Sequence, residues 1–93
     1  MEDIVAIRPE VDLTVAITWS DGRQARVNFV PIIDQSPVFA PMRDPSFFVQ
    51  NARITHGGGA IAWSDLLEFS SEGLRYDVFP EEYQRDFGGA AAE

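Results

Sequence analysis

The sequence contains no cysteine and no lysine, and each absence limits what the chain can do. Without cysteine it has no disulfides, no thiolate metal ligands and no cysteine nucleophile. Its seven arginines are scattered along the sequence, whereas proteins that bind a nucleic-acid backbone cluster their basic residues. The net charge of −8 points the same way. We therefore expect no nucleic-acid partner.

Long apolar runs are also missing. No run approaches the roughly 20 residues that a transmembrane helix needs. The start of the sequence, Met1-Glu2-Asp3, is acidic and lacks the apolar stretch of a secretory signal. We therefore expect no membrane association and a cytoplasmic location.

The sequence shows no catalytic, cofactor-binding or metal-binding motif. Its only histidine, His56, lies beside Gly57-Gly58-Gly59, and no serine lies in a Gly-x-Ser-x-Gly elbow. The glycine run lacks the Lys-Ser/Thr of a phosphate-binding loop, so we expect a turn there. One histidine with carboxylates could bind a metal, but no ligand spacing supports it. We assign no catalytic, cofactor or metal residues and expect a protein that is not an enzyme.

The remaining composition is that of a small globular domain. The chain has 93 residues, of which 45% are hydrophobic and 12% aromatic, enough for one modest core. Its acidity has two main interpretations. The simpler is that charge keeps a small protein soluble; the other is an acidic face that docks a basic partner. Mimicry of nucleic acid is a third.

Residues 13–29 form the stretch around which the rest of the chain is organised. Apolar and polar residues alternate on both sides of Ser20-Asp21-Gly22, which predicts a β-hairpin. An Asp21-Gly22 turn would place apolar residues opposite polar ones. A three-residue loop aligns the apolar faces and needs Gly22 in the left-handed conformation. It gives these opposing pairs: Trp19 with Arg23, Ile17 with Ala25, Val15 with Val27 and Leu13 with Phe29.

A second hairpin is predicted over residues 52–64, with a different loop. Here a two-residue Gly57-Gly58 loop aligns the apolar faces. It gives these opposing pairs: His56 with Gly59, Ile54 with Ile61 and Ala52 with Trp63. Trp19 and Trp63 then both point inward, which predicts core packing; an exposed aromatic patch is the alternative.

The segments before and after the first hairpin contain proline-marked elements. Residues 4–8 predict a first strand beside the hairpin, and Pro9 ends it. Pro31 predicts a short helical turn that places Ile32 and Ile33 on the sheet. Residues 35–42 predict an irregular crossing. Its expected anchors are Val38, Phe39 and Met42.

The second half of the chain supplies a helix and further apolar anchors. Asp44 followed by Pro45 predicts a helix start, with Phe47 and Phe48 in the core. Ser70-Ser71-Glu72 predicts a cap for a turn carrying Leu74. Leu66, Leu67, Phe69, Tyr76, Val78 and Phe79 are expected apolar contacts. Residues 80–87 predict one or two helical turns that end at Gly88-Gly89.

These elements predict an α+β fold: an antiparallel sheet of two β-hairpins plus an N-terminal strand, covered by short helices. We expect a single domain over residues 1–79. Residues 80–93 form a short C-terminal extension, frayed over residues 90–93.

Three aspartates are the most suggestive carboxylates. Asp21, Asp34 and Asp44 each lie at a turn or a helix start, which favours local capping by the side chain. Catalysis by a carboxylate pair would need two of them within about 5–9 Å of each other.

The order of these motifs resembles the DUF2442 family of small bacterial proteins of unknown function. The residues that carry the resemblance are Trp19-Ser20-Asp21-Gly22, Pro31-Ile32-Ile33, Phe39, Asp44, Phe47, the isoleucine-x-Trp63 strand, Glu72 and Leu74. The resemblance covers most of residues 3–75. Family members often have Asp at Asn28, Pro at Ser71 and Asn-Gly at Asp65-Leu66.

The resemblance implies an α+β fold without an agreed activity. Genes of the family often lie beside small proteins suspected of being toxins, which implies an antitoxin-like or partner-binding role. Some members continue into a helix-turn-helix. The tail after Val78 is shorter than that motif, so the resemblance implies a copy that does not read DNA.

We therefore expect a non-enzymatic protein-interaction or regulatory module whose partner is a small protein from a neighbouring gene. Two alternatives stay open. One is a small-ligand binder or enzyme with a carboxylate cleft, which a pocket with two strongly shifted carboxylate pKa values would favour. The other is a homo-oligomer that pairs exposed edge strands.

Overall fold

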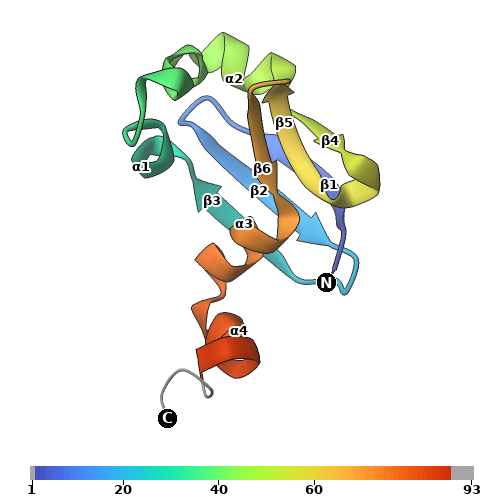
Figure 1. Ribbon diagram of the computed structural model, residues 1–93. Coiled ribbons are helices and arrows are strands. Elements are labelled where there is room, and N and C mark those ends of the chain that lie inside the picture. Colours follow the sequence, from blue (N-terminus) through green and yellow to red (C-terminus); the bar gives the residue numbers. More distant parts are fainter. Residues whose placement is uncertain (1, 89–93) are drawn as a thin grey trace.

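The computed structural model describes residues 2–88 and shows two antiparallel three-stranded sheets with short helices (Figure 1). The first sheet contains, in order, β1 (Ile4–Pro9), β2 (Thr14–Trp19) and β3 (Gln24–Asn28). The second contains β4 (Arg53–Thr55), β5 (Ala60–Ser64) and β6 (Leu67–Ser70). The predicted α+β class and the predicted first strand are confirmed.

Short helices connect and cover the sheets at both ends (Figure 1). Between the sheets lie α1 (Val30–Ile33), the 3-10 helix η1 (Pro37–Arg43) and α2 (Pro45–Asn51). After the second sheet come α3 (Ser71–Val78), α4 (Pro80–Tyr83) and the π-helical turn η3 (Gln84–Gly88). In the view of Figure 1, α4 projects beyond the two sheets. None of the helices within residues 2–88 has the length and apolar character needed to cross a bilayer.

The first hairpin has the predicted three-residue loop. Val15 pairs with Val27 and Ile17 with Ala25. The backbone N–H of Trp19 donates to the Arg23 carbonyl at 3.0 Å, which closes the loop one pair further on. Gly22 has a φ of +89°, in the left-handed region that glycine adopts without a Cβ clash. The predicted pairing of apolar residues across the first hairpin is thereby confirmed.

The second hairpin has the predicted register. Ile54 pairs with Ile61, and the Gly59 N–H donates to the His56 carbonyl at 3.1 Å across Gly57-Gly58. Both central glycines have positive φ, +63° and +105°, as a type I′ turn requires. The segment His56–Gly58 (η2) is thus a tight turn at the end of β4.

This turn also joins the two sheets. A Cβ atom on Gly58 would lie 2.7 Å from the Cβ of Asp3 and 2.8 Å from the carbonyl oxygen of Ile4. The turn therefore packs directly against the start of β1, and β4 lies beside β1 (Figure 1).

Aromatic rings fill the space between the sheets. Trp19, Trp63, Phe29 and Phe48 are almost completely buried. The Phe29 ring meets those of Phe48, Trp63 and Phe69 edge to face, at centroid distances of 5.8, 5.1 and 5.2 Å. The Trp63 indole N–H donates to the Phe48 carbonyl at 2.8 Å. The predicted core positions of both tryptophans and of Phe48 are confirmed, whereas Phe47 is half-buried.

Two predicted apolar anchors are wrong. Val38 is 49% exposed, because residues 37–43 form a 3-10 helix rather than an irregular crossing. Its three-residue repeat places Phe39 and Met42 on the inner face and Val38 outside. Leu66 is 81% exposed, because it lies in the turn between β5 and β6.

A sixth strand was not predicted. Residues 67–70 form β6, which pairs Phe69 with Ile61 and completes the second sheet. Strand β5 is therefore central in its sheet, and four consecutive residues of it, 60–63, are buried. This explains why its sequence, Ala60-Ile61-Ala62-Trp63, is apolar at every position instead of alternating.

The helix starts follow the predicted caps. Asp44 accepts a hydrogen bond from the Ser46 N–H, and Ser70 accepts one from the Gly73 N–H. The helical turns predicted over residues 80–87 are α4 and η3. Residues 89–93, including the predicted frayed end, lie outside the described residues. The division into a domain over 1–79 and an extension over 80–93 stays a prediction.

Candidate functional site

The three suggestive aspartates have different surroundings. Asp44 caps α2, and Asp21 accepts a local hydrogen bond from the Arg23 N–H at 3.1 Å, so local capping is confirmed for both. The Asp34 carboxylate instead pairs with Arg43.

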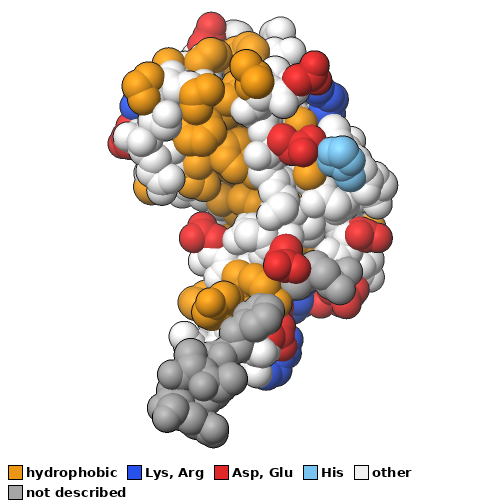
Figure 2. Space-filling model, viewed as in Figure 1, with side chains coloured by type: hydrophobic (Ala, Val, Ile, Leu, Met, Phe, Trp, Pro, Cys, Tyr) orange, Lys and Arg blue, Asp and Glu red, His pale blue; other side chains and the backbone are white. Residues whose placement is uncertain are grey.

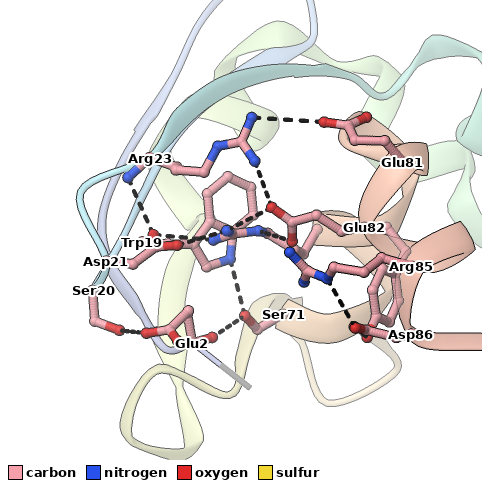
Figure 3. Close-up of polar contacts among 12 residues, drawn as sticks. Glu2, Trp19, Ser20, Asp21, Arg23, Ser71, Glu81, Glu82, Arg85 and Asp86 are labelled. Atoms are coloured by element: carbon pink, nitrogen blue, oxygen red, sulfur yellow. Dashed lines mark hydrogen bonds and ion pairs between the residues drawn. The ribbon is translucent and has the colours of Figure 1, made fainter.

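Asp21 additionally belongs to a cluster of charged side chains, the Arg75 cluster, made of Asp21, Arg23, Arg75 and Glu82 (Figure 3). The Arg75 side chain, on α3, is only 4% exposed. It binds the Asp21 carboxylate through Nη1 and Nη2 at 3.1 and 2.6 Å. It binds the Glu82 carboxylate through Nε and Nη2 at 2.8 and 2.9 Å. One guanidinium thus holds two carboxylates, both in the two-pronged geometry that suits its planar fork.

A second guanidinium reaches the same glutamate. Arg23 Nη1 lies 2.6 Å from Oε2 of Glu82, and its Nη2 lies 3.7 Å from the exposed Glu81. The Arg23 guanidinium also lies 3.7 Å above the centroid of the Phe79 ring. Arg75 lies 5.2 Å from the rings of both Phe79 and Trp19. Both guanidinium groups therefore make cation–π contacts with aromatic rings.

These ion pairs control the protonation of the two carboxyl groups. Hydrogen bonds from Arg75 lower the pKa of Asp21 to about 2. Arg75, with a smaller contribution from Arg23, lowers the pKa of Glu82. The two carboxylates in turn raise the pKa of Arg75. All these groups are charged at neutral pH, so neither acid is suited to exchange protons with a substrate there.

A polar pocket of about 620 Å³ surrounds the cluster. Its lining includes Glu72, Tyr76 and Asp86 besides the cluster residues. The Tyr76 hydroxyl donates to Asp86 at 2.8 Å, which raises the pKa of Tyr76 to about 12 and lowers that of Asp86. Two carboxylates meet in this pocket, as a carboxylate cleft requires. Their pKa values are lowered, however, which is the direction that ion pairing produces.

A second hollow is an apolar groove between α1, η1, β6 and α3, with a volume of about 360 Å³. Its apolar lining residues are Ile32, Phe39, Phe69 and Leu74; the charged ones are Glu68 and Asp77, and Gln35, Ser70 and Gly73 complete it. Figure 2 shows the strip of hydrophobic side chains on this face, with acidic side chains at its margins. No basic residue lines this groove within residues 2–88.

A third hollow, of about 460 Å³, lies on the outer face of the first sheet. The strand register places Ala16 between Arg8 and Arg26 across the three strands. Arg26 is paired with Glu10. Arg8 and Arg26 therefore line one hollow and Arg23 and Arg75 line another, although the arginines are scattered in the sequence.

His56 lies at the end of β4, as predicted, and its Nε2 lies 3.0 Å from the Glu68 carboxylate. Both side chains are exposed, 66% and 43%. Across residues 2–88, the His, Asp and Glu side chains form no group of three or more that could hold a metal ion.

Sequence reasoning missed Arg75 and Glu82. Arg75 lies 54 residues from Asp21 in the sequence, and Glu82 lies 59 residues from Arg23. The only local signal is that Arg75 follows Leu74 on α3 and is buried beside it.

A comparison with solved structures corrects one prediction. The fold is similar to the crystal structure of a candidate DNA-binding protein from Nitrosomonas europaea, with a TM-score of 0.66 and 25% sequence identity. The match covers 85% of this chain and 47% of that one, so the chain spans about half the length of the protein it resembles. This similarity contradicts the prediction that the chain has no nucleic-acid partner. Net charge is a sum over the whole chain and does not report what an assembled protein binds.

The sequence comparisons identify a family without a known activity. No curated protein matches the chain significantly. The family model for proteins of unknown function DUF2442 matches residues 4–80, which include both sheets and α3. The chain belongs to the DUF2442 family.

Proposed function

We propose that this domain is a non-enzymatic protein-interaction module that binds a basic partner protein in its apolar groove. The observation that carries the proposal is the composition of the groove: an apolar floor whose charged rim residues are both acidic. Phe39 and Phe69, with ring centroids 5.6 Å apart, are half-buried and remain open to the groove. Partly exposed aromatic side chains of this kind are typical of surfaces that bind another protein.

The charges select the class of partner. Glu68 and Asp77 line the groove, and the whole chain carries a net charge of −8. A segment with apolar anchors flanked by Lys or Arg complements both features. Attraction between opposite charges speeds association and disfavours acidic competitors.

The similar structure supports a place for this module in a DNA-binding assembly. Proteins that bind the phosphate backbone are rich in Lys and Arg, and they are therefore the kind of basic partner that an acidic groove selects. The chain matches about half of a candidate DNA-binding protein, which is the relation expected of a module joined to another functional part.

The enzyme alternative is less well supported. The Asp21 and Glu82 carboxylates converge on Arg75, but their pKa values are lowered, so they stay ionised and paired. A general acid at neutral pH needs a raised pKa. Pairing of edge strands between copies, the other alternative, stays a prediction.

Capture from a lysate of the source organism tests the proposal through two charge reversals. Asp77→Lys reverses a rim charge, whereas Asp65→Lys makes the same change at an exposed residue outside the groove lining. We expect wild type and Asp65→Lys to retain a protein of basic pI that Asp77→Lys loses. Retention of the same proteins by all three chains, or of acidic proteins only, would contradict the proposal.

A further inference from the structure

The Arg75 cluster has the composition of a receptor with its ligand bound. The family-matched span, residues 4–80, contains Asp21, Arg23 and Arg75. Glu82 lies just beyond that span, on α4, and its carboxylate receives hydrogen bonds from both guanidinium groups. The two arginines therefore lie within the family-matched span, and Glu82 lies in the segment that follows it.

Without Glu82, both guanidinium groups of the cluster would lose a carboxylate partner. Of the carboxylates described above, Arg75 would retain Asp21, and Arg23 would retain the exposed Glu81 at 3.7 Å. Arg75 is 4% exposed, and a buried cation is costly unless an anion neutralises it. The paired, planar donors of Arg75 select a carboxylate in a defined orientation.

Glu82 is also the buried polar link between α4 and the domain. Its side chain is 8% exposed, whereas Tyr83, which meets the Tyr76 ring edge to face, is 47% exposed. Helix α4 has only four residues, and an isolated helix of that length is unstable in water. The Glu82 carboxylate therefore links α4 to the first hairpin through Arg23 and to α3 through Arg75 (Figure 3).

We propose that Arg23 and Arg75 form a binding site for a peptide carboxylate, and that residues 80–86 are its intramolecular ligand, exchangeable with an acidic peptide segment of the same kind. This inference does not depend on the groove. The effective concentration of a tethered segment is on the order of millimolar, so a free peptide competes in that range or occupies the site once Glu82 is removed.

The test uses the full chain with Glu82→Gln and the matched control Glu81→Gln on the same helix. We expect Asp21 to keep its pair with Arg75 in both variants. We expect Glu82→Gln, but not Glu81→Gln, to shift the NMR signals of the Arg75 Nε–H and to raise amide hydrogen exchange in residues 81–86 at least tenfold. The Trp63 indole signal, from the core, checks that the fold is intact.

A peptide of residues 80–86, acetylated and amidated so that it has no terminal charge, is then added to Glu82→Gln. We expect the Arg75 signal to return towards its wild-type position in a saturable manner, and the same peptide with Gln in place of Glu82 to have no effect. Equal effects of the two peptides, or equal spectra of the two variants, would overturn the proposal. In the wild-type chain, excess peptide should raise amide hydrogen exchange in residues 81–86; unchanged exchange at peptide concentrations up to tens of millimolar would also overturn the proposal.

Discussion

The indole Nε1 of Trp19 donates a 3.1 Å hydrogen bond to the hydroxyl of Ser71, which lies 52 residues away in the sequence. The Ser71 hydroxyl in turn donates a hydrogen bond to the Glu2 carbonyl at 3.0 Å. This chain of hydrogen bonds fixes the start of α3 on the first hairpin. Because Arg75 lies one helical turn after Ser71, the same contact places its guanidinium near the Trp19 ring.

Replacing Ser71 with alanine should destabilise the fold. The variant leaves the buried indole N–H of Trp19 without its acceptor, which costs about 1–3 kcal/mol of the free energy of unfolding. Chemical denaturation measures it. Ser46→Ala, at an exposed position in α2, should change that free energy by less than about 0.5 kcal/mol. Equal effects of the two substitutions would show that the hydrogen bond contributes nothing.

The two central glycines of the second hairpin should differ in tolerance. Both have positive φ, so alanine strains either one by about 1–2 kcal/mol. At Gly57 the new Cβ meets nothing within 4 Å, whereas at Gly58 it collides with Asp3 and Ile4. We expect Gly58→Ala to lower the melting temperature several degrees further than Gly57→Ala. Similar melting temperatures would argue against packing of this turn on β1.

Adjacent leucines at the start of β6 provide a third test. Leu67 is 3% exposed and Leu66 is 81% exposed. Leu67→Ala should cost about 2–5 kcal/mol of the free energy of unfolding, through lost burial and a residual cavity. Leu66→Ala should cost less than about 0.5 kcal/mol. A larger effect at Leu66 would mean that the strand has the opposite register.

The free energy of unfolding should decrease as the pH is lowered from about 4 to 2, the range over which Asp21 becomes protonated. Its pKa is about 2 in the folded chain against 3.8 as the ordinary value, so its contribution is complete above about pH 4 and is lost as pH falls through 2. In Asp21→Asn this contribution is absent at every pH. We expect the difference in free energy of unfolding between wild type and variant to shrink from pH 4 to pH 2 in urea titrations. A constant difference across that range would show that the Asp21 ion pair does not contribute to the free energy of unfolding.

The alternation of side chains was sufficient to predict the first hairpin, and the alignment of Ile54 with Ile61 and of Ala52 with Trp63 was sufficient to predict the second. A shift of one residue turns every side chain to the other face, so the buried positions of Trp19 and Ile61 leave one loop length for each hairpin. Leu67-Glu68-Phe69-Ser70 alternates in the same way, but its four residues were too short to be recognised as β6.

The Arg75 cluster could not be predicted in this way. Its members come from the first hairpin, α3 and α4, and no local pattern relates their spacing. Their meeting follows from how α3 packs against β3 and β6, which is a consequence of the complete fold. Charge summed over the sequence likewise gave no indication that two arginines would gather around one glutamate.

The most direct test of the proposed function is calorimetric titration of the captured basic partner into three chains: wild type, Asp77→Lys and Asp65→Lys. The account predicts an affinity about tenfold weaker for Asp77→Lys, with a steeper loss in low salt, and an affinity within about twofold of wild type for Asp65→Lys. Equal affinities for all three chains would contradict it.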